Sequence, residues 1–239
     1  MAGRLSSQPA SPSLREALGE RRLAGTFLKL PALEVVEIAA AGLDFAVVDL
    51  EHSQLSEADA LRLVRHAWAL GFPAVVRLHE LDRALVNRLL EAGAAGIQLS
   101  SVRRSAEVAA LRDACLYAPG GTRSISLAHP LARYGATSLR DYLAEQEPPL
   151  VVAQIETAAT DDPLEEILGA GADVAFVGVT DLSVDLGLDA ARVDARIREI
   201  ADAAAAAGVL LGGFGADERW RYAVASSDLA LLREAYAGG

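Results

Sequence analysis

Short apolar runs bounded by glycine, proline and acidic residues alternate along the chain with longer segments in which apolar residues recur every three or four positions. Runs of the first kind are typical of buried strands, and segments of the second kind are typical of amphipathic helices. We predict strands over residues 24–30, 45–49, 73–77, 96–99, 151–155, 173–177, 209–212 and 221–225. We predict helices over residues 33–41, 57–70, 84–92, 105–114, 163–168 and 193–206.

The alternation predicts a parallel sheet covered by crossover helices, and eight such units close into a (β/α)₈ TIM barrel. An open doubly wound sheet is the alternative. No G-x-G-x-x-G motif follows the first strand, however, and the number of successive strands favours closure. Only residues 213–220 separate the last two strands, which is too few for an outer helix with its loops, so we expect a degenerate seventh helix.

Three of the predicted helices end in a glycine shortly before the next strand, at Gly42, Gly93 and Gly171. Glycine adopts the left-handed conformation that ends many helices without a steric penalty. We therefore predict a left-handed cap at each of these positions.

Composition is typical of a single globular domain. The chain has 239 residues, of which 52% are hydrophobic and 23% charged, and no apolar run is long enough to cross a bilayer. Residues 1–14 are rich in Ser, Pro and Arg and contain no apolar signal region, so we expect a flexible tail followed by one catalytic domain over residues 15–239. Cys115 is the only cysteine, which excludes an internal disulfide and fits a reducing cytoplasm.

Charge narrows the possible partners and chemistry. The net charge of −11 and the absence of a basic stripe argue against a nucleic-acid partner. Lys29 is the only lysine, so it is the only candidate for an amine that forms a Schiff base with a carbonyl substrate.

Polar side chains gather where the predicted strands end. In a (β/α)₈ barrel the C-terminal ends of all strands meet at one mouth, and catalytic groups collect there. In chain order these residues are Asp49, Glu51, His52, Arg77, Gln154, Glu156 and Asp181. The sequence therefore predicts an acidic active site at the mouth.

Glu156 and Asp181 are candidate metal ligands. They follow the fifth and sixth strands, which are neighbours in a barrel, so their carboxylates could approach closely and would then need a cation. Oxygen ligands with the remaining positions left to water and substrate are typical of Mg²⁺ or Mn²⁺. The structural alternative is that each acid caps, or lies in the first turn of, a following helix.

His52 and Arg77 are candidates for proton transfer and substrate binding. Asp49 could orient the His52 ring and fix its tautomer, so that the ring accepts a proton near neutral pH. An arginine at the end of a strand offers a planar fork to a substrate carboxylate. The alternatives are a surface histidine, and an ion pair of Arg77 with Glu51 or Glu91.

These clusters, in this order, resemble the HpcH/HpaI family of metal-dependent pyruvate aldolases. The motifs that carry the resemblance are GTF (25–27), VVDLEH (47–52), VVRL (75–78), LLEAGAAGIQL (89–99), YAPGGTR (117–123), VVAQIET (151–157) and FVGVTDLSVDLG (176–187). Their register along most of the chain, rather than any single motif, makes the resemblance specific. Ser100, Ser124 and Val179 depart from the family pattern, so the shapes of their loops are expected to differ.

The resemblance implies a barrel of the phosphoenolpyruvate/pyruvate type. It also implies a homo-oligomer, a hexamer built as a trimer of dimers with helix exchange between paired subunits. Glu156 and Asp181 would bind a divalent metal, which would be Mg²⁺, Mn²⁺ or Co²⁺. The metal would stabilise negative charge on the 2-oxo group of the substrate.

The resemblance also assigns roles to residues around that metal. Arg77 would bind the pyruvyl part of the substrate, and His52 with Asp49 would transfer protons. Glu91 matches an acidic position near the metal-bound water. The remaining residues expected to line the substrate site are Phe27, Gln154, Gly178, Val179 and Thr180, the last three through backbone amides that cradle the carboxylate.

The expected reaction is the reversible aldol cleavage of a 4-hydroxy-2-oxo acid to pyruvate, or a close 2-oxo acid, and an aldehyde. One alternative is a synthase or lyase that joins the enolate of oxaloacetate or a similar acid to another acid. A Schiff-base aldolase that uses Lys29 and a non-catalytic metabolite-binding barrel are the others.

Overall fold

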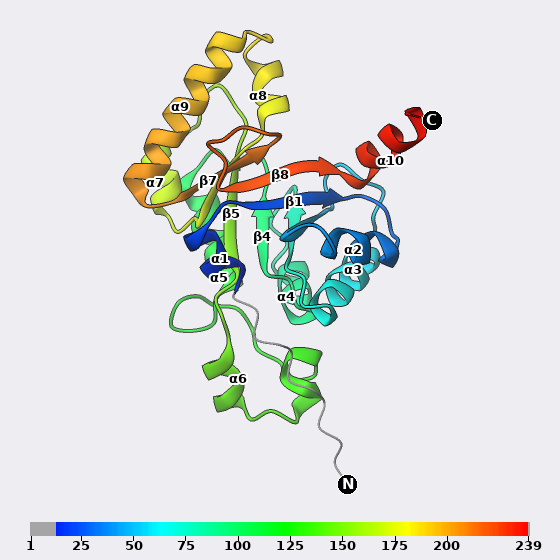
Figure 1. The fold of residues 1–239 in the computed structure, drawn as a ribbon. Coiled ribbons are helices and arrows are strands. Elements are labelled where there is room, and N and C mark those ends of the chain that lie inside the picture. The colour runs from blue at the N-terminus through cyan, green and yellow to red at the C-terminus, as the bar shows by residue number, and fades with distance from the viewer. Residues whose placement is uncertain (1–12, 239) are drawn as a thin grey trace.

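The computed structural model describes residues 13–238, and its strands form one closed parallel barrel in the order of the sequence (Figure 1). The strands are β1 (Leu23–Leu28), β2 (Phe45–Asp49), β3 (Ala74–Leu78), β4 (Gly96–Leu99), β5 (Leu150–Ile155), β6 (Val174–Val177), β7 (Leu210–Phe214) and β8 (Tyr222–Ser227). The barrel closes because β1 pairs with both β2 and β8. The predicted (β/α)₈ fold is confirmed.

Helices surround the barrel on its outside (Figure 1). Those the sequence predicted are α2 (Leu33–Ala40), α3 (Glu57–Ala69), α4 (Arg83–Ala92), α5 (Ser105–Cys115), α7 (Leu164–Gly169) and α9 (Ala190–Ala207). The described chain has no helix between β7 and β8, which agrees with the predicted degenerate seventh helix. No helix of residues 13–238 is long and apolar enough to cross a membrane.

Several elements were not predicted. They are α1 (Leu14–Glu20), the 3₁₀ helix η1 (Pro130–Gly135), α6 (Leu139–Glu145), α8 (Val179–Asp185) and α10 (Asp228–Ala237). Most of them are short, so they carry little hydrophobic periodicity. The predicted tail ended at residue 14, but α1 begins there, and Leu14 is buried. The rest of that tail, residues 1–12, lies outside the described residues.

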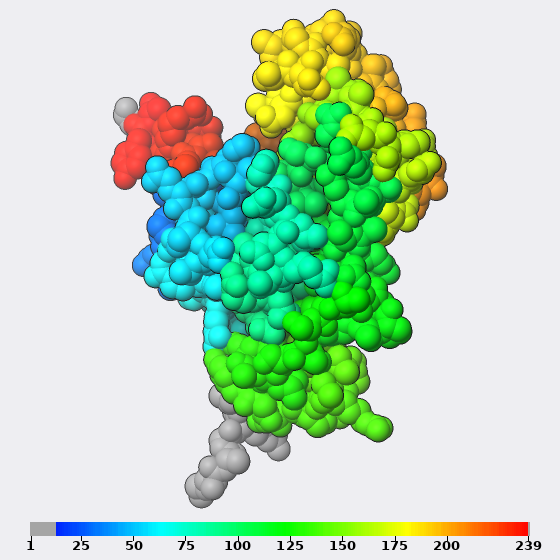
Figure 2. Space-filling view, turned by 180° about the vertical axis from the view of Figure 1, so that it is seen from behind, coloured from blue at the N-terminus to red at the C-terminus, as the bar shows by residue number. Residues whose placement is uncertain are grey.

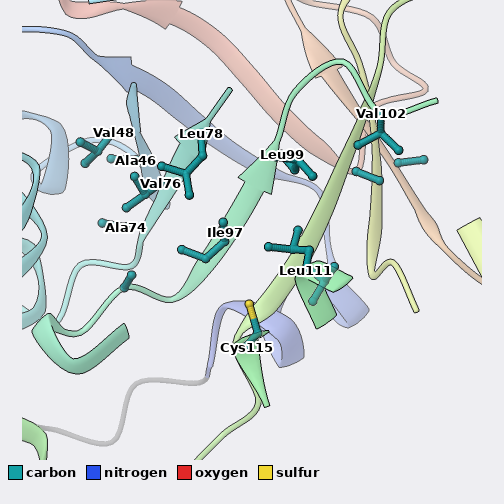
Figure 3. Packing of buried hydrophobic residues seen from close by; sticks show 14 of the residues in the cluster. Ala46, Val48, Ala74, Val76, Leu78, Ile97, Leu99, Val102, Leu111 and Cys115 are labelled. Carbon is teal, nitrogen blue, oxygen red and sulfur yellow. The ribbon is translucent and has the colours of Figure 1, made fainter. Parts of the chain in front are cut away.

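Side chains alternate along each strand between the outside and the inside of the barrel, so the core has two layers. One set of side chains points outward and packs against the helices, as Figure 3 shows for Val48, Val76 and Ile97 on the strands and Leu111 and Cys115 on α5. The other set fills the inside of the barrel. Its members are Leu23, Phe27, Phe45, Val47, Val75, Leu150, Val152, Val174, Phe176, Tyr222 and Val224, with Leu14 and Leu18 of α1. Burying each such side chain contributes about 1.5–3 kcal/mol.

Two segments extend away from the barrel. The connection between α5 and β5, which contains η1 and α6, lies at the end of the molecule opposite α8 (Figure 1). After β8, helix α10 projects outward, and Figure 2 shows a gap between α10 and the pair α8 and α9. α10 touches the rest of the chain mainly where it meets β8 and β1. Its packing is therefore incomplete within a single chain.

Two of the predicted glycine caps are confirmed and one is wrong. Gly93 and Gly171 adopt φ values of 110° and 115°, in the left-handed range. Gly42 is not in that range, because the chain leaves α2 through Ala41, which is still right-handed, and the Gly42 N–H bonds the Ala39 carbonyl as a tight turn.

Candidate active site at the barrel mouth

Four polar side chains face the inside of the barrel near the C-terminal ends of β2 to β5. The other inward-facing residues of these strands are apolar, such as Val47. The inward positions nearest the mouth are instead polar, and they are occupied by Asp49, Arg77, Gln98 and Gln154. Asp49 pairs in register with Arg77, and Arg77 with Gln98. All four side chains are buried. The strand register alone therefore brings a charged and polar layer together at one level of the barrel.

Asp49 is the centre of this layer. Arg77 binds it through two hydrogen bonds, Nε to Oδ1 at 2.9 Å and Nη2 to Oδ2 at 2.7 Å. Lys29 Nζ donates to Oδ2, and the backbone N–H groups of Glu51 and His52 donate to Oδ1. Burial by itself would raise the pKa of Asp49. The hydrogen bonds and charge of Arg77, with those of Lys29, outweigh burial and hold the pKa below its usual range.

The sequence suggested that Asp49 orients the His52 ring, but in the structure it does not. Asp49 accepts the backbone N–H of His52 instead, at 3.2 Å. The carboxylate nearest the ring is Glu51, whose Oε2 lies 3.7 Å from His52 Nε2, and the ring itself is 58% exposed. The reason is competition, since two cations and two backbone amides already occupy both oxygens of Asp49.

Glu51 is a second, largely buried carboxylate, which the sequence placed at the mouth and considered as a possible partner of Arg77. Ser100 Oγ donates to Oε1 at 2.6 Å, and Arg77 Nε lies 3.3 Å from Oε2. The ring of His79 also reaches Oε1, at 3.3 Å. Arg77 thus forms ion pairs with Asp49 and Glu51, rather than with Glu91.

Glu156 follows β5 and is 6% exposed, yet its partners are all neutral. Ser101 donates to Oε1 from both its backbone N–H and its hydroxyl, at 2.8 and 2.7 Å. Gln154 Nε2 donates to Oε2, and Gln98 Nε2 donates in turn to Gln154 Oε1 at 2.6 Å. Both carboxylate oxygens are therefore held by a fixed network of uncharged donors.

The backbone around Glu156 is shaped to fit it closely. Ser101 has a φ of 53°, which is uncommon for a residue other than glycine and places its N–H and hydroxyl on the same oxygen. Gly178 lies against the other oxygen, and a Cβ added there would lie 2.3 Å from Oε2. The Gly178 N–H donates to the Ile155 carbonyl, so it is not a spare donor for a substrate carboxylate.

Asp181 lies in the first turn of α8, one strand along from Glu156, and is exposed. Its side chain does not cap the helix, but its place in the first turn matches the other half of the structural alternative. Within residues 13–238 no group of three or more His, Cys, Asp or Glu side chains forms a complete metal site. A metal here would rest on two carboxylates and complete its shell with water and substrate.

Phe27 forms one wall of the same space. Its ring lies 4.4 Å from the guanidinium carbon of Arg77 and packs edge to face on Phe176 and in a stacked arrangement on Phe214. A cation over an aromatic face is attracted by the ring quadrupole, so Phe27 helps to fix the plane of Arg77.

Glu91 does not lie at the mouth of its own chain. It lies near the end of α4, just before β4 begins, and thus near the N-terminal end of that strand. Its side chain accepts a hydrogen bond from Asn87, one turn earlier. Helices of a (β/α)₈ barrel run antiparallel to the strands, so the end of α4 lies at the opposite face of the barrel from the ends of β5 and β6.

A separate cavity of about 400 Å³ lies at that opposite face. It is lined by residues of α1, by Trp68, by the starts of β3 to β5, by Arg123 and by residues 145–149. None of the inward-facing polar residues of the mouth lines it. We place the chemistry at the mouth because the buried charges converge there.

Sequence reasoning missed Gln98 and Ser101 and gave Glu51 no functional role. The signal for Gln98 was present, because it is a polar residue inside the apolar run GIQL at an inward position. Ser101 could not be found in this way, since its role depends on an unusual backbone conformation outside a strand.

Comparison with known proteins agrees with this geometry. The model of the HpcH/HpaI aldolase/citrate lyase family matches residues 24–225. A hydroxypyruvate/pyruvate aldolase of Rhizorhabdus wittichii is 32% identical over 235 residues, covering 91% of this chain and 92% of the relative. A 4-hydroxy-2-oxovalerate aldolase of Rhodococcus jostii is 33% identical over 180 residues, covering 73% and 69%.

Solved structures give the same result. The crystal structure of an HpcH/HpaI aldolase from Desulfitobacterium hafniense superposes with a TM-score of 0.86 at 28% identity and covers 95% of each chain. An HpcH/HpaI aldolase/citrate lyase family protein from Burkholderia cenocepacia superposes with a TM-score of 0.84 at 27% identity, covering 94% of this chain and 96% of the other. The motifs, the barrel and these similarities together establish that the chain belongs to the HpcH/HpaI aldolase/citrate lyase family.

Proposed function

We propose that this protein is a metal-dependent aldolase that reversibly cleaves a 4-hydroxy-2-oxo acid into pyruvate, or a close 2-oxo acid, and an aldehyde. The observation that carries the proposal is the buried Glu156 carboxylate at the mouth, held only by uncharged donors, in the same mouth as the buried Arg77. Relatives named as hydroxypyruvate/pyruvate aldolase and 4-hydroxy-2-oxovalerate aldolase support the same class of reaction.

Glu156 and Asp181 would hold the metal, and the residues present fit one. A buried carboxylate without a cation is costly. Among the described residues only Ser101 and Gln154 contact Glu156 with donors, and neither is charged. Two carboxylates with open positions fit Mg²⁺, Mn²⁺ or Co²⁺. When bound, such a cation would polarise the 2-oxo group and stabilise negative charge on its oxygen.

Arg77 would bind the carboxylate of the pyruvyl part. Its Nε and Nη2 are already engaged by Asp49, and this fixes the plane of the guanidinium. The outer edge, formed by Nη1 and the second N–H of Nη2, can then meet a substrate carboxylate with two parallel hydrogen bonds. The N–H groups of Val179 and Thr180 open α8, where backbone donors have no acceptor within the helix, and would support the same carboxylate.

Gln154 would act on Glu156 more directly than on the oxo acid. Its Nε2 donates to Glu156 and its Oε1 accepts from Gln98, so both ends of the amide are engaged. A contact with the substrate would require one of these bonds to open.

His52 would move the proton in the carbon–carbon step. Its ring is exposed and follows the end of β2, so it would be able to reach a hydroxyl of the substrate. In cleavage, a ring nitrogen takes the proton of the 4-hydroxyl as the C3–C4 bond breaks. The electron pair of that bond stays with the three-carbon fragment, and a proton then returns to C3.

The projecting α10 supports a homo-oligomer with helix exchange. Leu229, Leu231, Leu232 and Tyr236 on this helix are between 43% and 85% exposed in the single chain. Apolar surface of this kind is stabilised when a second copy covers it. A hexamer built from such pairs would bury this helix on its neighbours.

Glu91 would then serve the mouth of a neighbouring copy. Within one chain it lies at the face opposite Glu156, so a role near the metal needs a second subunit. This makes the oligomer part of the catalytic proposal.

A Schiff-base mechanism fits the structure less well. The single lysine, Lys29, donates from Nζ to Asp49 and to the His52 carbonyl. An amine used in this way offers no free electron pair to a carbonyl group. The same contacts occupy the Lys29 ammonium group. They therefore argue against its binding an extra substrate carboxylate, as a reaction on oxaloacetate would require. Borohydride treatment in the presence of pyruvate should therefore leave Lys29 unmodified.

The first test is proton exchange at the methyl group of pyruvate in D₂O, followed by NMR. The enzyme is stripped with chelator and then restored with Mg²⁺, Mn²⁺ or Co²⁺. We expect exchange only with metal, because breaking a methyl C–H bond requires stabilised charge on the 2-oxo group. No exchange with any of the three metals would contradict the proposal.

Glu156→Gln and Asp181→Ala should each abolish metal-dependent exchange. Glu165→Gln is the matched control, because Glu165 is an exposed acid in the first turn of α7. Full activity of either mouth variant would remove that residue from the metal site.

A further inference from the structure

We infer that Lys29 is a positioning residue for proton transfer: it holds Asp49 and the turn 50–53 in place, so that His52 is presented to the substrate by its backbone. The inference rests on the proposed function, since it assigns the support of a step in that reaction. Lys29 forms no part of the candidate metal site and is not proposed to touch the substrate.

The Lys29 side chain joins the segment after β1 to the end of β2 and to the turn that follows β2. Its Nζ donates to Asp49 Oδ2 and to the His52 carbonyl, the latter at 2.8 Å, and the side chain is only 17% exposed. One cation thus bonds both the last residue of β2 and the turn that follows.

The other end of Lys29 is fixed as well. The backbone N–H groups of Lys29 and Leu30 donate to Asp228 Oδ2 at 2.7 and 2.9 Å. Asp228 is the first residue of α10 and is 5% exposed. The lysine therefore reaches Asp49 from an anchored backbone, so only its side-chain rotamers remain to be ordered by the contacts of Nζ.

The His52 backbone is held on both sides by groups that meet at Asp49. Its N–H donates to Asp49 Oδ1, and its carbonyl accepts from Lys29. Ser53 Oγ adds a bond to the Asp49 carbonyl. Within residues 13–238 the carboxylate beside the ring is that of Glu51, which lies 3.7 Å away and beyond hydrogen-bond distance, so the ring is less restrained than the backbone. The position of the ring therefore depends on the turn.

Lys29 also shares the charge of Asp49 with Arg77. Both cations bond Oδ2 of the fully buried carboxylate. Without Lys29, Arg77 alone would balance Asp49, and the turn would lose its bond at the His52 carbonyl. The first effect leaves Arg77 bound to Asp49, so pyruvate binding should persist. The second effect loosens the proton-transfer group.

The test compares Lys29→Met, which keeps the length of the stem but removes the donors, with Lys29→Arg, which restores them. Arg15→Met is the matched control, because it removes an ion pair, that of Arg15 with Asp173, at the other end of the barrel. All variants are checked by circular dichroism and thermal unfolding before the metal-loaded enzyme is assayed.

We expect Lys29→Met to lower kcat for metal-dependent proton exchange and for aldol cleavage by about 10- to 100-fold, the usual result of misplacing a reacting group. KM for pyruvate and the Kd for Mn²⁺ should change little. Lys29→Arg should recover most of kcat, and Arg15→Met should match wild type in kcat. An unchanged kcat in Lys29→Met, or equal losses of Mn²⁺ binding and turnover, would overturn the inference.

A second measurement does not depend on activity. Because Lys29 is the only lysine, protein made with ¹⁵N-lysine should give one side-chain ammonium signal, and hydrogen bonding should protect its protons from exchange with water. Asp49→Asn should shift that signal and accelerate its exchange. A signal with the exchange rate of free lysine would overturn the inference even if the aldolase assignment holds. A protected signal in an enzyme without exchange activity would instead overturn the proposed function, and would leave of this inference only the contact of Lys29 with Asp49.

Discussion

At the scale of single residues, the site depends on which donors form hydrogen bonds with the Asp49 carboxylate. Both of its oxygens are used, by Arg77, Lys29 and two backbone amides, and the Asp49 side chain itself has no exposure to water. A carboxylate in this position cannot also hold the His52 ring. It acts as the fixed point from which Arg77 and the His52 turn are placed.

This arrangement makes a pH-dependent contribution to stability. The folded-state pKa of Asp49 is held below its usual range, against the effect of burial, by Arg77 and Lys29. The unfolded chain therefore takes up the proton first as pH falls. The stabilisation is complete above the unfolded-state pKa of about 3.9 and is lost as pH decreases toward the folded-state value.

We therefore expect Asp49→Asn to lower the free energy of unfolding at neutral pH by about 3 to 5 kcal/mol, because Arg77 and Lys29 lose the buried carboxylate that they share. Denaturant titrations of wild type and variant at a series of pH values check this. Their difference should be constant near neutrality and should shrink below about pH 4. A difference that grows on acidification would contradict the sign of this linkage.

At the scale of elements, the close approach of the β6–α8 turn to the end of β5 forms the pocket for Glu156. Gly178 directly follows β6, and it is the N-cap residue of α8. Its lack of a side chain leaves room for the carboxylate, while Ser101 after β4 holds the opposite oxygen. Three successive strands thus define one side-chain position.

Gly178→Ala should displace this carboxylate. The added Cβ would lie 2.3 Å from Glu156 Oε2, so the side chain or the turn must move. We expect the Kd for Mn²⁺ to rise by about 10- to 100-fold, as when a group that orients a metal ligand is lost, with turnover falling in parallel. Metal titration by calorimetry measures the change.

Gly169→Ala is the control for this change. Gly169 is the last residue of α7, and a Cβ added there meets nothing within 4 Å. It should leave metal binding intact, since alanine also favours the helix. Equal metal affinity in the two variants would show that space at Gly178 does not control Glu156.

At the scale of the whole molecule, the single chain leaves two features without a local use. Helix α10 exposes apolar side chains away from the barrel, and Glu91 lies at the face opposite the metal carboxylates. Both are accounted for if paired subunits exchange helices and complete each other's mouths.

Removal of residues 229–239 should therefore convert the oligomer into smaller species. The deletion keeps Asp228, which bonds the end of β1, and removes the exposed leucines. Light scattering coupled to size exclusion measures the mass. An unchanged assembly after the deletion would exclude α10 as its main contact.

Complementation tests the role of Glu91. Glu91→Ala and Glu156→Gln should each be inactive alone, but a co-expressed mixture should recover activity, because one mouth of a mixed pair then has both residues intact. Glu156→Gln mixed with Arg77→Ala is the control, since both residues belong to the mouth of one chain. Recovery in the control mixture, or none in the test mixture, would contradict sharing between subunits.

The sequence by itself determined the barrel and most of its polar layer. Apolar runs and helical periodicity are local features of the sequence. They therefore predicted all eight strands and six of the helices, with bounds close to those in the structure. The alternation of inward and outward side chains along a strand is also local. It therefore places Asp49, Arg77 and Gln154 on the inward face of their strands. It did not predict the short helices α1, α6 and α8, because such segments contain too little periodicity to separate them from loops.

Only the tertiary structure decided which of these groups touch. The bond of Lys29 to Asp49 and the His52 carbonyl joins separate elements, and the choice of Glu51 over Asp49 beside the His52 ring follows from competition for the same oxygens. The position of Glu91 depends on the direction of a helix relative to the sheet. Contacts of this kind are set by packing across the barrel, which no local pattern of residues encodes.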